Sequence, residues 1–201
     1  RVIARPFIGT PGAFERTANR KDYAVAPPQG MLLDKLEERG IIVHGVGKIS
    51  DIFLSRGIRF SDKTKNNPDG MAKTIEAMDE TPAGLIFVNR VDFDRVYGHR
   101  NDVGGYAGAL EEADAWPPTL FAKVGSGDLA ILTADHGNDP TTPGTDHTRE
   151  RVPILAFGPG IRPADLGVRT SFADLGQTIA DGLGVRPLTT GTSFLPTITT
   201  R

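Results

Sequence analysis

Short apolar runs alternate with amphipathic stretches along most of this chain. In the amphipathic stretches the apolar positions recur at the spacing of a helix with one buried face. The predicted strands are residues 41–47, 85–88, 129–132 and 154–157, and the predicted helices are residues 31–40, 69–78, 103–115 and 172–182. This alternation is typical of an α/β fold, so we expect a mainly parallel sheet flanked by helices.

Two polar segments, each directly after a predicted strand, contain three of the four histidines. The first, residues 89–99, contains His99, and the second, residues 133–147, contains His136 and His147. Each of these histidines lies within five residues of an aspartate. Open α/β sheets bind their ligands beyond the carboxyl ends of the strands, so we expect the chemistry in these two segments.

Carboxylate oxygens and imidazole nitrogens together suit Mn²⁺ or Zn²⁺ better than Mg²⁺. A lone histidine in a polar loop is more often an ordinary surface residue, but three of them beside aspartates at strand ends favour a metal site. Asp92 and Asp94 would share one face of an extended segment, so either is a candidate ligand alongside His99. The fourth histidine, His44, lies inside the strand 41–47, and we expect it to be structural.

The two segments offer ligands for two ions. Asp94, His99 and His147 would fill one site. The adjacent residues Asp135 and His136, which diverge on an extended backbone, would then serve a second. Two metal ions about 4 Å apart commonly hold the attacking and leaving oxygens of a phosphoryl transfer. The second ion would need further ligands from elsewhere.

Composition narrows the classes of partner. The chain has 201 residues, room for one core and an attached piece, with a net charge of -2 and a pI near 6.1. We therefore expect no nucleic acid and no acidic membrane surface as partner. It has no cysteine, which excludes disulfides and thiolate ligands. The apolar runs are too short for a membrane helix and no signal peptide is recognisable, so we expect a cytoplasmic protein.

Four motifs carry a resemblance to a known family, and the similarity runs nearly end to end. They are Thr133-Ala134-Asp135-His136-Gly137, Gly144-Thr145-Asp146-His147-Thr148-Arg149-Glu150, Val91-Asp92-Phe93-Asp94 with Gly98-His99-Arg100, and Arg1-Val2-Ile3-Ala4-Arg5-Pro6-Phe7. On these motifs the sequence resembles the C-terminal part of bacterial phosphopentomutases. That family belongs to the alkaline phosphatase superfamily, with the cofactor-independent phosphoglycerate mutases as close relatives.

The resemblance implies a fold, an activity and a set of small molecules. Residues 1–24 would be the end of an inserted cap domain and its return linker, and residues 25–201 the C-terminal part of an alkaline-phosphatase-like, metal-binding α/β core. The implied activity interconverts ribose 1-phosphate, or deoxyribose 1-phosphate, with the 5-phosphate. It implies an isomerase with a pentose phosphate substrate, two Mn²⁺ ions and a sugar bisphosphate activator.

The resemblance also assigns ligands. It implies that Asp94, His99 and His147 bind one manganese ion and that Asp135 and His136 bind the other. In the family, an aspartate near the N-terminus and a threonine that carries the phosphoryl group complete the second site. Neither has a counterpart in this sequence, so we expect the nucleophilic threonine in an N-terminal part that is absent here, and no catalytic nucleophile within these residues.

Basic residues at two places are candidates for holding substrate phosphate. Lys48 directly follows the strand 41–47, at the edge where the metal loops are expected, and a lysine near the metals is a feature of the superfamily. A group of arginines in residues 1–24 is the weaker candidate: Arg1, Arg5, Arg16 and Arg20.

Other interpretations stay open at this point. The same metal ligands would serve a cofactor-independent phosphoglycerate mutase or a metal phosphohydrolase of the same superfamily. A metal-binding fragment without catalysis is an interpretation of another class. The opening Arg1–Phe7 motif and the Asp146–Glu150 motif favour the pentose enzyme.

Overall fold

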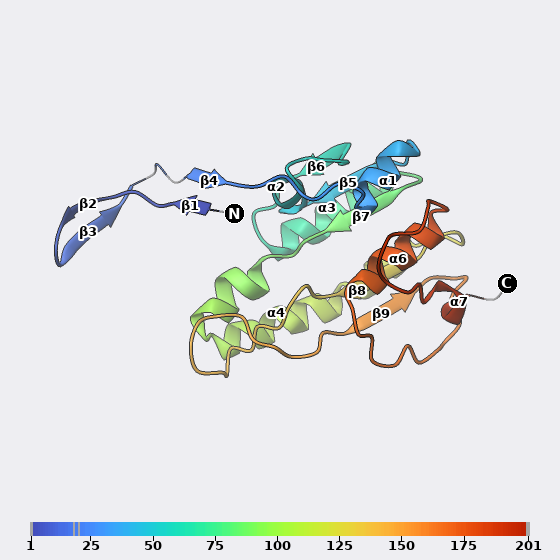
Figure 1. Ribbon diagram of the computed structural model, residues 1–201. Coiled ribbons are helices and arrows are strands. Elements are labelled where there is room, and N and C mark those ends of the chain that lie inside the picture. The colour runs from blue at the N-terminus through green and yellow to red at the C-terminus, as the bar shows by residue number, and fades with distance from the viewer. Residues whose placement is uncertain (1, 18, 20, 200–201) are drawn as a thin grey trace.

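The computed structural model describes residues 2–17, 19 and 21–199, and its first strands project away from the remainder (Figure 1). Strand β1 (Val2–Ala4) pairs antiparallel with β4 (Lys21–Tyr23), and β2 (Phe7–Thr10) forms a hairpin with β3 (Ala13–Arg16). The proposed cap boundary at residue 24 stays a prediction.

A three-stranded parallel sheet forms the centre of the next part. Strand β5 (Val43–Val46) lies between β6 (Phe60–Asp62) and β7 (Leu85–Val88). All four residues of β5 are buried, as expected of a strand covered on both faces. The helices along this part of the chain are α1 (Leu32–Glu38), α2 (Ile49–Phe53) and α3 (Asn67–Glu80).

The main core cluster joins distant parts of the chain. Leu33 and Leu36 of α1 pack with Val43 of β5 and with Ala180 and Val185 from the C-terminal region. Ala180 belongs to α6 (Ala173–Gly182), which therefore covers the sheet together with α1. The predicted α/β architecture with flanking helices is confirmed in this part.

The remaining elements follow β7. They are the π-helix η1 (Phe93–Tyr97), the 3₁₀-helix η2 (Gly98–Arg100), α4 (Val103–Ala115), α5 (Pro117–Phe121), β8 (Ala130–Thr133), β9 (Ile154–Phe157) and, after α6, α7 (Leu195–Ile198). Strand β9 runs antiparallel to β8, with Ile131 opposite Ala156. No helix lies between these two strands, whereas a parallel pair needs a crossover, usually a helix.

The carboxyl ends of β5 and β7 meet at one edge of the parallel sheet. Gly47, directly after β5, has a φ of +86°, and a Cβ there would overlap the backbone oxygen of Asn89. The Asn89 N–H in turn donates to the Val46 oxygen over 3.0 Å. This close approach places Lys48 and the segment that begins at Asn89 at the same sheet edge.

His44 of β5 is structural, as expected. Its side chain is 1% exposed, with Nε2 2.7 Å from a carboxylate oxygen of Asp62 and Nδ1 3.0 Å from the Thr81 hydroxyl. Both ring nitrogens are therefore used inside the protein.

Within the described residues, no helix is long and apolar enough to cross a membrane.

Candidate metal centre

Asp92 and Asp94 occupy different environments although they are two residues apart. Asp92 is 5% exposed, and its carboxylate accepts the backbone N–H of Asn67, at the start of α3, over 2.7 Å. The Asp92 N–H donates back to the Asn67 side chain over 3.3 Å. Asp94 lies in the first turn of η1, with about a third of its side chain exposed. Asp92 thus anchors the segment to α3, and the carboxylate of Asp94 is the one left to face the histidines.

The π-helix that carries Asp94 is a local feature that the sequence pattern does not predict. Single π turns inside helical segments are uncommon and occur often at functional sites. Here Phe93 of η1 packs edge-on against Tyr106 of α4, with ring centroids 5.5 Å apart. This packing fixes the turn against a longer helix, so Asp94 projects from a supported backbone.

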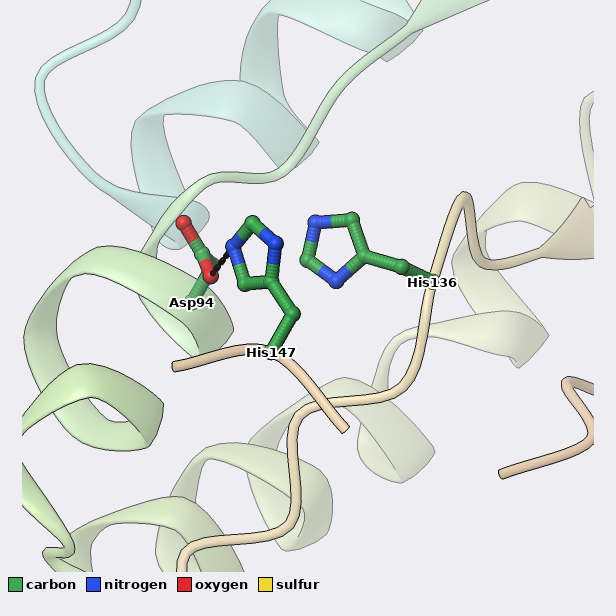
Figure 2. Close-up of side chains that lie close together, drawn as sticks. All are labelled: Asp94, His136 and His147. Carbon is green, nitrogen blue, oxygen red and sulfur yellow. Dashed lines mark ion pairs between the residues drawn. The ribbon is translucent and has the colours of Figure 1, made fainter. Parts of the chain in front are cut away.

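Four predicted ligands converge on this turn. Asp94 Oδ1 lies 3.0 Å from His147 Nε2 and 3.2 Å from His99 Nε2. Figure 2 shows the His147 ring between Asp94 and the ring of His136, whose centroid is 3.7 Å from that of His147. Asp94, His136 and His147 each offer a ligand atom, and these atoms all lie within 4.8 Å of one another.

Backbone carbonyls fix which nitrogen of two histidines carries hydrogen. His99 Nδ1 lies 2.6 Å from the Thr145 oxygen, and His136 Nδ1 lies 3.1 Å from the Gly137 oxygen. A carbonyl only accepts, so each Nδ1 must donate and each neutral ring presents a lone pair at Nε2. Metal-binding histidines commonly use this arrangement, with the second nitrogen held by a carbonyl or a carboxylate.

The lone pairs of the histidines face carboxylates. His99 Nε2 is directed at Asp94, and His136 Nε2 is 3.7 Å from a carboxylate oxygen of Asp135. Two acceptors at such distances attract one another only through a proton or a metal ion between them. The residues present therefore fit a divalent cation by the chemistry of their donor atoms, and carboxylate with imidazole is a set that suits Mn²⁺ or Zn²⁺.

Asp135 stands apart from the other predicted ligands. Its side chain is 75% exposed, and among the described residues its only ion pair is the one with the adjacent His136. The resemblance implies that Asp94 and His147 bind one ion and His136 the other, yet these three side chains lie together. Ions about 4 Å apart would have their ligands interleaved at this range, so this proximity is compatible with that division.

The sequence reasoning missed the groups that hold the two ligand segments together. Asn138 Nδ2 donates to Asp94 Oδ1 over 2.7 Å. Asn101 Nδ2 donates to the backbone oxygens of Pro140 and Thr142 over 3.2 and 3.0 Å. The signal was present as Gly137-Asn138-Asp139-Pro140, but that run indicates only a turn. These contacts fix residues 138–142 against η1 and against the residue that follows η2.

The surroundings of the cluster are acidic. Burial, followed by the negative charges of Asp139, Asp94 and Glu150, raises the pKa of the Tyr106 phenol. Hydrogen bonds from the hydroxyl and the backbone N–H of Thr141 lower the pKa of Asp139. The lowered pKa favours the charged form of the Asp139 carboxylate, and its negative charge favours a cation nearby.

The predicted substrate-binding residues have no hydrogen bond or ion pair with the metal cluster in the described part of the structure. Lys48 lies exposed at the start of α2, at the sheet edge where it was expected, and Arg5 lies exposed between β1 and β2. Arg1, Arg20 and the side chain of Arg16 lie outside the described part of the structure. Their roles in binding stay predictions.

Comparison with protein families matches residues 17–187 to the Metalloenzyme superfamily. The chain belongs to that superfamily. The chain is similar to several curated proteins named phosphopentomutase. The one from Anaeromyxobacter dehalogenans strain 2CP-1 is 56% identical over 99% of this chain and 51% of its own length. Those from Allorhizobium ampelinum and Caldanaerobacter subterraneus are 56% and 55% identical, each over 97% of this chain and 48% and 50% of theirs.

The chain spans about half the length of the curated relatives it matches. The resemblance to phosphopentomutases noted in the sequence is confirmed by these relatives. Among solved structures, a Leishmania mexicana phosphoglycerate mutase matches 85% of this chain and 39% of its own, with a TM-score of 0.64 and 20% identity. The Pyrococcus horikoshii protein PH0037 matches 63% and 35%, with a TM-score of 0.51 and 20% identity. These two likenesses show a shared fold.

Proposed function

We propose that the protein to which this chain belongs is a phosphopentomutase, which interconverts ribose 1-phosphate, or deoxyribose 1-phosphate, with the 5-phosphate. The observation that carries the proposal is 56% identity over 199 residues to a protein of that name, a span that includes both ligand segments. The convergence of Asp94 with His99, His136 and His147 supports it independently, because the reaction calls for a metal-assisted phosphoryl transfer.

Two manganese ions are part of the proposal. Asp94, His99 and His147 would hold one, and Asp135 and His136 would supply part of the other. When bound, such ions activate the oxygen that attacks or leaves phosphorus and balance the charge on the phosphoryl oxygens. The protein's own contribution is to hold the Nε2 lone pairs of His99 and His136 in place through the carbonyls of Thr145 and Gly137.

The phosphoryl carrier of the proposed reaction is a threonine outside these residues. Within the ligand motifs, the Thr148 hydroxyl is already engaged, since it accepts the Asp139 N–H and donates to Glu150. Thr133 donates to a neighbouring backbone oxygen. The length of the relatives, about twice that of this chain, supports a carrier elsewhere in the protein.

Substrate contacts complete the proposal. Lys48 would neutralise a phosphate at the sheet edge, and the arginines Arg1, Arg5 and Arg20 would hold the second phosphate position of the sugar. A sugar bisphosphate would prime the carrier threonine. The cytoplasmic location expected from the sequence stays a prediction.

The test is an assay of the protein expressed from its complete gene and loaded with Mn²⁺. We expect interconversion of ribose 1-phosphate and ribose 5-phosphate. Neither the conversion of 3-phosphoglycerate to 2-phosphoglycerate nor the release of inorganic phosphate should reach a comparable rate. Turnover of 3-phosphoglycerate alone would favour the phosphoglycerate mutase interpretation, and release of phosphate alone the phosphohydrolase. The 201 residues by themselves should convert no ribose 5-phosphate, and turnover by this chain, verified by mass, would place the carrier inside it.

A further inference from the structure

One side chain bridges the two segments that carry the predicted ligands. Asn138 lies between His136 and His147 in the chain, and its amide reaches across to Asp94 Oδ1, the oxygen that also faces His99 and His147. The Asp94 carboxylate is a third exposed, so without this bond water would compete for the oxygen and the side chain would sample other rotamers.

The position of Asn138 depends on a glycine. Gly98 of η2 has helical dihedral angles, φ −60° and ψ −58°, so its backbone does not require glycine. A Cβ at Gly98 would, however, overlap the nitrogen, carbon and oxygen of the Asn138 amide. The absent side chain is therefore what allows the amide to lie against η2 and reach Asp94.

The loop that carries Asn138 is fixed independently of this bond. Asn101, directly after η2, donates to the backbone of Pro140 and Thr142, and His99 bonds to the Thr145 oxygen. Asn101 itself has a left-handed φ of +52°, a conformation that asparagine tolerates better than most residues. Because other contacts hold the loop, the amide of Asn138 is a firm support for Asp94.

We propose that Asn138 is a positioning residue that holds the Asp94 carboxylate in the orientation that binds metal, with Gly98 providing the space for it. An amide N–H can only donate, and its bond to a carboxylate is charge-assisted, so it orients one oxygen without competing for the metal as a ligand. The inference rests on the proposed metal site. It predicts that loss of the amide weakens metal binding while the apo protein keeps its stability.

The experiment measures Mn²⁺ affinity by electron paramagnetic resonance titration, and thermal stability without metal, on the protein expressed from its complete gene. The variants are Asn138→Ala, Gly98→Ala and the two combined, with Asn19→Ala as the matched control on an exposed asparagine of another segment. Groups that orient metal ligands typically contribute 10-fold to 100-fold in affinity, so each single variant should bind Mn²⁺ about that much more weakly.

The combined variant separates positioning from packing. Gly98→Ala should change apo stability little, because the gain from alanine in helical backbone offsets the loss of the displaced amide's hydrogen bond, and it should weaken metal binding only through that displacement. In the absence of the amide, alanine at residue 98 should cause no further loss. Independent, multiplying losses, or an Asn138→Ala variant that binds like wild type, would overturn the proposal.

Two further outcomes are also decisive. If Asn138→Ala does not fold, Gly98→Ala alone carries the test, and unchanged affinity in that variant refutes the role of Asn138. If the wild-type protein binds no Mn²⁺, the proposed function fails first, and this result is distinct from equal binding by wild type and variants. Asn19→Ala should match wild type in both measurements.

Discussion

Histidine has different roles in the parallel sheet and in the loops beyond it. In the sheet, His44 is buried; its Nε2 donates to Asp62, and its Nδ1 bonds to the Thr81 hydroxyl, which can donate as well as accept. In the loops, His99 gives its Nδ1 hydrogen to a backbone carbonyl and turns its Nε2 lone pair toward the Asp94 carboxylate. Both ring nitrogens of His44 have hydrogen-bond partners within the protein. The Nε2 lone pair of His99 faces the Asp94 carboxylate, which can only accept a hydrogen bond.

The difference shows how a structural histidine is told from a metal-binding one. What matters is the balance of donors and acceptors around the ring, rather than the number of polar neighbours. Asp62 supplies His44 with an acceptor, and the Thr81 hydroxyl supplies a group that can either donate or accept. Around Asp94 the acceptors are in excess, and a cation corrects that excess.

Removal of metal should have the largest effect. Exhaustive EDTA treatment of the protein from the complete gene should abolish mutase activity, and Mn²⁺ should restore it better than Mg²⁺, because imidazole ligands disfavour magnesium. A coupled assay of ribose 5-phosphate formation measures this. Partial rescue by Co²⁺ fits the same ligand set. Activity that survives EDTA would remove the metal from the account.

Replacement of one loop histidine should come next. His147→Ala removes a ligand next to Asp94, and the loss in Mn²⁺ affinity should exceed the roughly 100-fold upper range of groups that only orient ligands. The residue is half exposed, so the apo protein should unfold at a similar urea concentration. Metal content after dialysis checks the prediction, with His44→Ala as the control. Equal manganese binding by the two variants would contradict our division of the histidines.

The buried histidine should show the reverse effect. His44→Ala leaves Asp62 and Thr81 without partners and opens a cavity, so the free energy of unfolding should fall by about 3 kcal/mol. Manganese affinity, measured below the melting temperature of the variant, should change little. Urea unfolding of the metal-free protein gives the first quantity. A variant that keeps its stability and loses its metal would reverse the assignment.

Asp174 extends the contrast to carboxylates and should give the smallest effect. Its buried carboxylate accepts the Thr192 N–H over 2.8 Å and pairs with Arg169 over 2.7 Å; the hydrogen bond first and Arg169 second hold its pKa below the ordinary value. A lowered folded-state pKa stabilises the protein above about pH 4, and that stability is lost as the pH falls further.

Asp174→Asn should therefore lower the free energy of unfolding by about 2 kcal/mol at pH 7, the range of hydrogen bonds to charged groups. The gap between wild type and variant should narrow below about pH 4, because the Asp174 carboxylate of the unfolded chain takes up its proton there before that of the folded protein does. Urea unfolding at pH 7 and pH 3 provides the comparison. A gap that is the same at both pH values would show that the charge of Asp174 contributes nothing.

Local sequence patterns predicted the elements that local physics determines. The helix predicted over residues 103–115 is α4, and the strand predicted at 85–88 is β7, because helical spacing of apolar residues marks the first and a continuous apolar run marks the second. The antiparallel direction of β9 was not predicted, since an apolar run carries no information on the direction of its neighbour. Helix α2 and strand β6 were also not predicted, because they form in a stretch without a clear periodicity of apolar residues.

The candidate site divides in the same way. The ligand types and their place after strands were predictable, because α/β proteins bind ligands beyond the carboxyl ends of their strands. The choice of Asp94 over Asp92 as the carboxylate facing the histidines depends on the π-helix and on the bond between Asp92 and Asn67. Asn138 was missed because its contact with Asp94 spans 44 residues. Contacts of that range follow from the tertiary fold and leave no local pattern.

The most direct measurement is a crystal structure of the protein soaked in Mn²⁺, with data collected at the manganese absorption edge. The account predicts an anomalous peak within coordination distance of the Asp94 carboxylate and of Nε2 of His99 and His147, and a second peak beside Asp135 and His136. Nδ1 of His99 should keep its bond to the Thr145 oxygen. A map without a peak at Asp94, or with manganese bound only at other residues, would contradict the assignment of these loops as a metal centre.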